Sequence, residues 1–361
     1  MTIGYTDLKS VIQFPQDWDL TYLRRWSLPA GVSFDQVVAR LGSALVLFNR
    51  SLLSGYYGQY VQVTTDIAME YDTGGDSGNL EEMAEYARPD PIQGKSTGHM
   101  LPMKDYGGAL GWTYTALRRG TMPKLERDIK RLIERSDNTW RRKLLGRLFT
   151  SVYESVGTGK SVPFADGGTA DSAYIPTSYG GATFAYTHNH FAAAADSSAG
   201  RSAALLAMSN HLFEHGIMPP YELLVPEADV AAWSAQTEFV KPDRGYMAAY
   251  GTLERATVDE STYIGIMELD RAWCQVKTET RLPTKYAGMF KPYGAGNTNT
   301  PLVVRYEQGY PLGLALVATI QQFPLQDAIA MMTFGFGIAN RLAGAATFFT
   351  GGASYVDPTI A

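Results

Sequence analysis

The 361-residue chain has a single cysteine, Cys274. One thiol cannot form an intrachain disulfide, and it cannot supply the clustered thiolates of a structural zinc site. Stabilisation by disulfides or by a cysteine-ligated zinc ion is therefore excluded. A lone cysteine is also typical of proteins that fold in a reducing compartment. We therefore expect a fold held by a hydrophobic core, which a chain of this length with 45% hydrophobic residues can bury.

The sequence also lacks an excess of positive charge and a long apolar run. Its formal net charge is -5, whereas proteins whose main task is to grip nucleic acid concentrate Lys and Arg. The most apolar tract, residues 312–349, is interrupted by polar residues before it reaches the length of a membrane span. The N-terminus has no basic segment followed by an apolar one, so we expect no secretory signal. A globular, non-membrane protein is favoured.

Catalytic motifs are scarce. There is no G-x-S-x-G nucleophile elbow, and the carboxylates are scattered. Residues 156–161 read Val-Gly-Thr-Gly-Lys-Ser, but a phosphate-binding loop needs a glycine where Glu154 stands and follows a strand, whereas this segment follows a predicted helix. We interpret it as a flexible connector.

One further motif has the pattern of a zinc site. His211-Leu-Phe-Glu-His215 matches H-x-x-E-H, in which two imidazoles one turn apart hold zinc and the glutamate polarises a water. The alternative is a helix end, where histidines favour the negative terminus and Gly216 supplies the cap. A zinc site needs a third ligand; His188 and His190 are candidates, although two histidines in a polar turn are commoner than a ligand pair. We favour the helix end, expect no metal, cofactor or catalytic residue, and keep a zinc metalloprotease as a remote alternative.

Several segments carry helical patterns. A capping box at 33–36 followed by periodic apolar residues predicts a helix of about 20 residues that ends at Gly55. The strongest signal covers 123–150, where apolar residues recur near the 3.6-residue period. About 28 residues at 1.5 Å each give a helix of roughly 42 Å. Further helices are expected at 199–215 and 228–236.

Period-two alternation predicts a strand from Val61 to Tyr71 and a matching strand from Leu110 to Ala116. The roughly 38 residues between them are too many for a connection in a compact domain, so either the assignment is wrong or the hairpin projects outward. Residues 1–32 are irregular and are interpreted as an arm. Other strands are expected at 221–225, 263–269, 273–280, 302–306 and 312–320, with a last apolar segment at 333–349.

The order of these elements is an arm, a capped helix, an overlong charged hairpin, a very long amphipathic helix and a mixed domain that ends in strands. It resembles the Hong Kong 97 type major capsid protein of tailed phages. Residues 219–233 look like the strand and short helix common in the axial domain of such subunits, and residues 335–349 look like their terminal strand. By order of elements, the resemblance covers nearly the whole chain.

The resemblance implies an α+β capsid fold. Its expected parts are an N-terminal arm (1–32), an N-terminal helix (33–56), an extended loop hairpin (57–118), a peripheral domain with a spine helix (119–162), an axial domain (163–275) and return strands of both domains (276–361). It further implies a major capsid protein, not an enzyme, which self-assembles as hexamers and pentamers into an icosahedral phage head around double-stranded DNA. An encapsulin nanocompartment shell, which shares this fold, stays open as an alternative.

The implied partners are other copies of the chain, portal and scaffolding proteins, a decoration protein, and packaged DNA bound without sequence specificity. No membrane and no cofactor are expected, and the location is the virion capsid after assembly in the host cytoplasm. We expect the acidic loop of one subunit to meet the basic helix of another, because contacts repeated around rings add up. The candidate residues are Asp72, Asp76, Glu81, Glu82, Glu85, Asp90, Arg127, Arg131, Arg141, Arg142 and Arg147.

Overall fold

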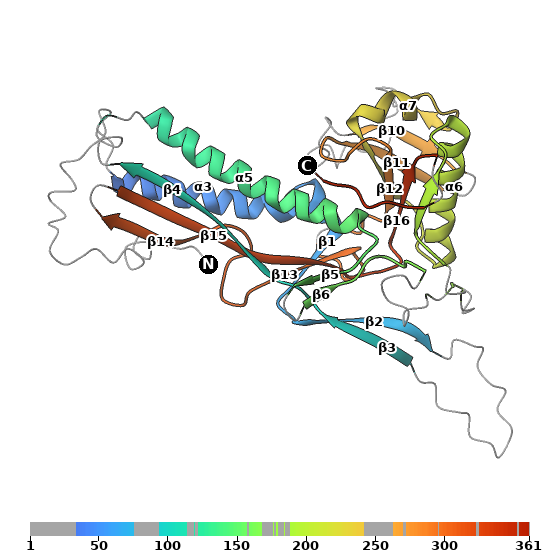
Figure 1. Cartoon of the computed structure of the whole chain (residues 1–361), viewed down its shortest axis with the longest axis horizontal. Helices are drawn as coiled ribbons and strands as arrows, with labels where there is room; N and C mark the ends of the chain where they lie inside the picture. The colour runs from blue at the N-terminus through green and yellow to red at the C-terminus, as the bar shows by residue number, and fades with distance from the viewer. Residues whose placement is uncertain are drawn as a thin grey trace, which may run out of the picture. The chain divides into compact units, whose positions relative to one another are not determined.

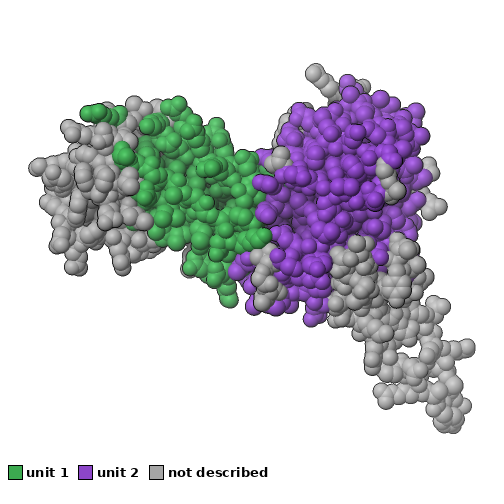
Figure 2. Space-filling model, in the orientation of Figure 1, with its two compact units in different colours: residues 1–54, 104–141, 306–334 green, residues 55–103, 142–305, 335–361 purple. Residues whose placement is uncertain are grey.

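The computed structural model describes residues 34–75, 94–113, 119, 122–156, 159–167, 176, 178–179, 184, 188–241, 263–269, 272–294, 296–322, 325–351 and 354–360. These residues form a mixed α+β fold (Figure 1). They group into two compact units (Figure 2): unit 1 is 1–54, 104–141 and 306–334, and unit 2 is 55–103, 142–305 and 335–361. No helix among the described residues is long and apolar enough to cross a membrane.

The first described helix of unit 1 is α3, Phe34–Ser54, as predicted. Its residues at helical spacing face the core of the unit; the buried ones are Leu41, Leu45, Phe48 and Leu52. Asn49 fixes the helix to the segment before β14: its Nδ2 donates to the Leu314 carbonyl at 3.0 Å, and its Oδ1 accepts from the Leu314 amide at 2.7 Å. Ser33, the predicted cap, lies outside the described residues.

Helix α5, Met122–Phe149, confirms the predicted long amphipathic helix. Its residues up to Arg141 belong to unit 1 and the rest to unit 2. In unit 1 the ring of Trp140 is buried, and its centroid lies 4.9 Å from that of Phe334. Gly108 allows a close approach to the helix, because an added Cβ would lie 2.6 Å from Leu132 Cδ1.

The sheet of unit 1 is built on β15, Leu325–Ile338, whose residues 325–334 belong to this unit. Strands β14 (Ala315–Gln322) and β4 (Lys104–Thr113) both pair with it in antiparallel orientation (Figure 1). One face of β15 points into the core, since alternate residues are buried: Ala328, Ala330, Met332 and Phe334.

Unit 2 contains a seven-stranded sheet with the order β7-β16-β12-β8-β11-β10-β9. Its strands are β7 (Phe191–Ala194), β8 (Tyr221–Pro226), β9 (Phe239–Val240), β10 (Tyr263–Glu268), β11 (Trp273–Glu279), β12 (Tyr286–Phe290) and β16 (Gly344–Phe349). The β8–β11 and β7–β16 pairs are parallel. All six residues of β8 are buried, as expected for a strand covered on both faces.

Two helices pack on this sheet. Helix α6, Ser198–Glu214, buries Leu205, Met208 and Leu212 in the same core cluster as Val276 of β11. Helix α7 (Val230–Ser234) follows the 3-10 turn η2 (Glu227–Asp229) and contributes Trp233 to that cluster. Gly216 ends the α6 segment with a positive φ of 76°, which a residue with a side chain rarely adopts, so the predicted stop signal is confirmed.

The remaining elements of unit 2 are short. Turn η1 (Tyr56–Tyr60) leads into β1 (Val61–Thr64), which pairs in parallel with β13 (Leu302–Tyr306). Strands β2 (Ala68–Gly75) and β3 (Gly94–Met100) form an antiparallel hairpin, and β5 (Glu154–Val156) pairs with β6 (Gly159–Ser161). The predicted connector at 156–161 is therefore partly a strand pair.

The predicted strand pairing around the hairpin is wrong. Residues 61–71 form parts of two strands, β1 and β2, which belong to different sheets. The return strand expected at 110–116 corresponds to the end of β4, which pairs with β15 instead, and residues 114–116 lie outside the described residues. Alternation signals a half-covered strand, but it does not identify the partner strand.

Two further expectations change in detail. The strand expected at 312–320 is β14, shifted to Ala315–Gln322. The apolar segment 333–349 is the end of β15 followed by β16, which are separated by a turn at 339–343 and lie in different sheets. The predicted arm, residues 1–32, lies outside the described residues, and the division into arm, loop, peripheral and axial parts stays a prediction.

Candidate functional site

The basic face of α5 was the first predicted contact surface. Arg127, Arg131 and Arg142 are exposed on this helix. Arg141 is half-buried and forms an ion pair with Asp137 one turn earlier, with Nε and Oδ2 2.8 Å apart. The exposed arginines place positive charge at the surface of the helix, and their contact with an acidic partner stays a prediction.

Arg147 does not belong to this exposed set, and its prediction as an intersubunit contact is corrected. Its side chain is 4% exposed. The guanidinium donates to the backbone carbonyls of Ser161 at 3.2 Å, Thr150 at 2.6 Å and Val152 at 2.9 Å. Burial lowers the pKa of Arg147 to about 10. The residue therefore ties the end of α5 to the β5–β6 region within one chain.

The predicted acidic partners are on and beyond the β2–β3 hairpin. Asp72 lies in β2 opposite Ser96 of β3. The other predicted carboxylates, Asp76, Glu81, Glu82, Glu85 and Asp90, lie outside the described residues. The contact between acidic loop and basic helix stays a prediction.

The start of the hairpin exposes apolar side chains. Ile67 is 52% exposed and Met100 is 42% exposed. Their backbones lie on neighbouring segments, since the Leu101 amide donates to the Ile67 carbonyl at 2.7 Å and Ala68 pairs with Met100. Val63 of β1 is also exposed. We call Val63, Ile67 and Met100 the exposed hairpin residues.

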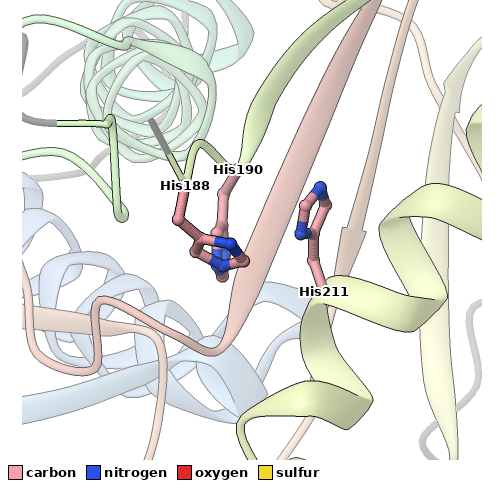
Figure 3. A group of neighbouring side chains, drawn as sticks. All are labelled: His188, His190 and His211. Carbon is pink, nitrogen blue, oxygen red and sulfur yellow. The ribbon is translucent and has the colours of Figure 1, made fainter. Parts of the chain in front are cut away.

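A second candidate site lies in unit 2, where four of the five histidines meet. His188 and His190 precede β7, and His211 lies in α6 (Figure 3). His215 follows α6. The Nε2 atoms of His188, His190 and His215 are 3.0, 3.1 and 3.2 Å from one another. His211 offers a ring nitrogen within 4.8 Å of ligand atoms on His188 and His190. We call these four residues the histidine cluster.

The cluster is partly buried, since His188, His211 and His215 are half-buried. His190 is buried and its Nδ1 lies 2.8 Å from the Gly344 carbonyl oxygen. The ring of Phe184 stacks on that of His188 with centroids 4.2 Å apart. Burial, and then the neighbouring imidazoles, lower the pKa of His188 to about 4 and the pKa of His190 well below its ordinary value. These two imidazoles are neutral at pH 7, which is the form that binds metals.

This arrangement differs from the helix end favoured by the sequence analysis. His211 and His215 do lie at the end of α6, but their rings face His188 and His190, with centroids between 5.0 and 5.2 Å apart. The polar turn at 188–190 therefore supplies the additional imidazoles that a metal site at His211 and His215 requires. The spacing of the histidines was visible in the sequence, whereas their convergence depends on the pairing of β7 with β16.

The glycine-rich segment 156–161 has a packing explanation. An added Cβ at Gly159 would lie 2.5 Å from the Cα of Pro102, so the residue must be glycine for β6 to approach the backbone of that segment. Residues 157–158 lie outside the described residues. Nothing in the described part of the segment requires a phosphate ligand.

No protein-family model and no curated protein matches this sequence. Among solved structures, the chain is similar to one from Mycobacterium phage Patience, with a TM-score of 0.64 and 17% identity over 96% of each chain. The mature capsid of bacteriophage PhiM1 contains a chain with a TM-score of 0.51 and 8% identity, over 82% of this chain and 87% of that one. The chain has the Hong Kong 97 type capsid fold.

The Hong Kong 97 fold confirms the fold class predicted from the order of elements. At identities of 17% and 8%, the likeness is one of fold, and the chain's own residues must carry any further argument. A holo-SrpI encapsulin complex from Synechococcus elongatus is also similar, with a TM-score of 0.40 and 10% identity over 81% of this chain and 86% of that one.

Proposed function

We propose that the chain is the major capsid protein of a tailed phage and assembles into an icosahedral head. The observation that carries the proposal is the likeness to the Patience chain over 96% of both chains, because the shared fold then includes both units and not one small motif. The role is structural and not enzymatic. The assembled protein is a component of the virion.

The exposed hairpin residues are candidates for a contact between subunits. A two-stranded hairpin such as β2–β3 is marginally stable alone, so a neighbouring subunit that covers Ile67 and Met100 stabilises both the hairpin and the contact. Each contact repeats around a ring, so modest interfaces suffice for a closed shell.

The finer assignments follow from the same proposal. Subunits assemble as hexamers and pentamers, and the acidic loop of one subunit meets Arg127 and Arg131 of the next. Portal and scaffolding proteins, and a decoration protein, complete the head. Double-stranded DNA is enclosed without sequence-specific contacts, in keeping with a net charge of -5. Assembly takes place in the host cytoplasm.

Electron microscopy of the expressed full chain tests the proposal. We expect closed uniform shells, or rings of five and six subunits. The variant Ile67→Asp places a charge at the start of the hairpin. Because the Ile67 side chain is already 52% exposed, the isolated subunit stays within about 0.5 kcal/mol of the parent. Assembly should be lost in Ile67→Asp and kept in the matched control Ile67→Val. Monomers that persist at high concentration of the parent chain would refute the proposal.

A charge-swap experiment tests the contact between loop and helix separately. Arg127→Glu with Arg131→Glu should block assembly, and adding Glu81→Lys with Glu82→Lys should restore it, since opposite charges then face each other again. The control is Arg127→Lys with Arg131→Lys, which keeps the charge. Assembly of the reversed variant at the parental level would remove this contact and leave the capsid role intact.

Particle contents distinguish the phage head from the encapsulin alternative. Particles purified from producing cells are expected to contain double-stranded DNA and a portal protein. DNA-free shells that contain a co-purifying enzyme would support an encapsulin. Because both outcomes require closed shells, this experiment is independent of the assembly test.

A further inference from the structure

The histidine cluster has a hydrogen-bonding pattern that neutral imidazoles cannot satisfy among themselves. A carbonyl oxygen only accepts, so the 2.8 Å contact between His190 Nδ1 and the Gly344 carbonyl places the proton of His190 on Nδ1. Its Nε2 therefore presents a lone pair to the cluster. The side chain is 1% exposed, so water does not reach that nitrogen freely.

The Nε2 atoms of His188 and His215 cannot both donate a hydrogen bond to this lone pair and also satisfy each other. Each Nε2 of His188 and His215 carries either one proton or one lone pair, and a proton directed at one neighbour is not directed at the other. With three nitrogens 3.0 to 3.2 Å apart, at least two of the same kind face each other. A cation at the centre accepts all three lone pairs and removes this conflict.

We propose that the cluster is a structural zinc site in which His188, His190 and His215 bind Zn²⁺ through Nε2. Tetrahedral zinc with Zn–N bonds of 2.0–2.1 Å separates its ligand nitrogens by about 3.3 Å. The observed separations of 3.0 to 3.2 Å need only a few tenths of an ångström of adjustment. The contact from Gly344 orients His190 in the way that a backbone carbonyl commonly orients a metal-binding imidazole.

His211 supplies the fourth ligand. One of its ring nitrogens lies within 4.8 Å of ligand atoms on His188 and His190. Its Nδ1 is buried and makes no hydrogen bond to the described residues, and it lies 3.5 Å from a carboxylate oxygen of Glu214. Ligation of His211 uses a polar group that is otherwise unsatisfied, and it gives zinc the four-coordinate shell of a structural site.

Zinc bound in this way would crosslink two segments of unit 2. The zinc ion joins the segment that leads into β7 to the end of α6, two pieces of unit 2 that lie about two dozen residues apart in the chain. Because the ligands take this arrangement only in the folded subunit, zinc binding stabilises the fold. This inference does not depend on whether the subunits close into a shell.

Metal analysis of the purified full chain tests the proposal. The protein is stripped with EDTA, reloaded with Zn²⁺, freed of excess metal and measured for zinc per chain. We expect about one zinc in the parent and in His99→Gln, which removes the only histidine outside the cluster, and about none in His188→Gln with His215→Gln. Reloading should raise the unfolding temperature of the parent by on the order of 5 °C and leave the double variant unchanged.

A second measurement protects the test against a misfolded variant. Co²⁺ added to the stripped parent should give the visible absorption of a tetrahedral nitrogen site, and Zn²⁺ should abolish it. His211→Gln should keep a weaker site with an altered spectrum, because three ligands remain. Absence of zinc and of the Co²⁺ bands in the parent, or full zinc content in the folded double variant, would overturn the proposal.

Discussion

The buried ion pair between Lys277 and Glu222 gives the sharpest prediction about subunit stability. Lys277 Nζ and Glu222 Oε1 are 2.5 Å apart, and the two side chains are 6% and 5% exposed. Glu222 Oε2 also accepts hydrogen bonds from the Gln59 side chain at 2.7 Å and from the Tyr60 hydroxyl. The carboxylate thus joins β11 and β8 to turn η1.

The attraction between the two charges and the cost of removing them from water nearly cancel. At 2.5 Å and an effective dielectric constant of about 20, the attraction is about 7 kcal/mol. Removing two ions from water costs several kcal/mol each, so the net contribution of the intact pair is small. Burial lowers the pKa of Lys277 even though Glu222 acts in the opposite direction, which agrees with a large desolvation penalty.

Breaking the pair is therefore far more costly than replacing it. Lys277→Met leaves the Glu222 carboxylate buried without its cation and should destabilise the subunit by about 3 to 5 kcal/mol. The double variant Lys277→Met with Glu222→Leu should recover much of that loss. It loses the acceptor of Gln59 and Tyr60, at about 1 kcal/mol for each hydrogen bond.

Urea unfolding of the unassembled subunit, followed by tryptophan fluorescence, measures these differences. Trp233 is a reporter in the same unit, since it is 1% exposed in the core cluster. Lys277→Arg serves as a control that keeps the charge. A cost of less than about 1 kcal/mol for Lys277→Met, or single-variant effects that add up to the double, would refute the argument.

Two further predictions separate internal residues from surface residues. Arg147→Met should destabilise the subunit by about 3 kcal/mol, because three backbone carbonyls lose their charged donor. The exposed Arg142→Met should change the unfolding free energy by less than about 0.5 kcal/mol. Equal effects would contradict the assignment of Arg147. Cys274 should resist thiol reagents at pH 8 until the subunit unfolds, because burial raises the pKa of its thiol to about 12. Since this pKa lies above the unfolded value of 9.0, the contribution of Cys274 to stability is present below pH 9 and is lost as the pH rises toward 12, so Cys274→Ala should flatten that decline.

Helices were predictable because their signals are local. Apolar spacing and Pro123 located α5, and Gly216 marked the end of the α6 segment. The side-chain partners were less predictable. Arg147 lies among the polar positions of an amphipathic pattern, yet it is buried, and its guanidinium donates to the backbone carbonyls of Thr150, Val152 and Ser161.

Strand pairing was not predictable from the sequence. Strand β4 alternates as a half-covered strand should, but its partner β15 begins more than 200 residues later. Alternation is also satisfied by β1 and β2, which join different sheets. Pairing over such separations depends on the closure of the whole fold, and no short window of sequence encodes it.

The candidate site was half predictable for the same reason. Two histidine pairs, His188 with His190 and His211 with His215, were apparent as short motifs. Their convergence requires β7 to pair with β16, and the contact that orients His190 comes from Gly344, 154 residues away. A histidine pair near another histidine pair in an otherwise histidine-poor chain was the only signal available to sequence reasoning.

Residues that fold the subunit and residues that assemble it are distinct, which makes the proposals separable. Glu222, Lys277 and Arg147 are buried with partners inside one chain, so their loss lowers the stability of the subunit before any assembly step. Ile67 and Met100 are already exposed in the subunit, and replacing them with charge costs the fold little. Variants of the first kind should be poorly soluble or unfolded, whereas variants of the second kind should be folded and unassembled. A folded subunit of Ile67→Asp that still forms shells would therefore place the assembly surface elsewhere without weakening the case for the histidine cluster.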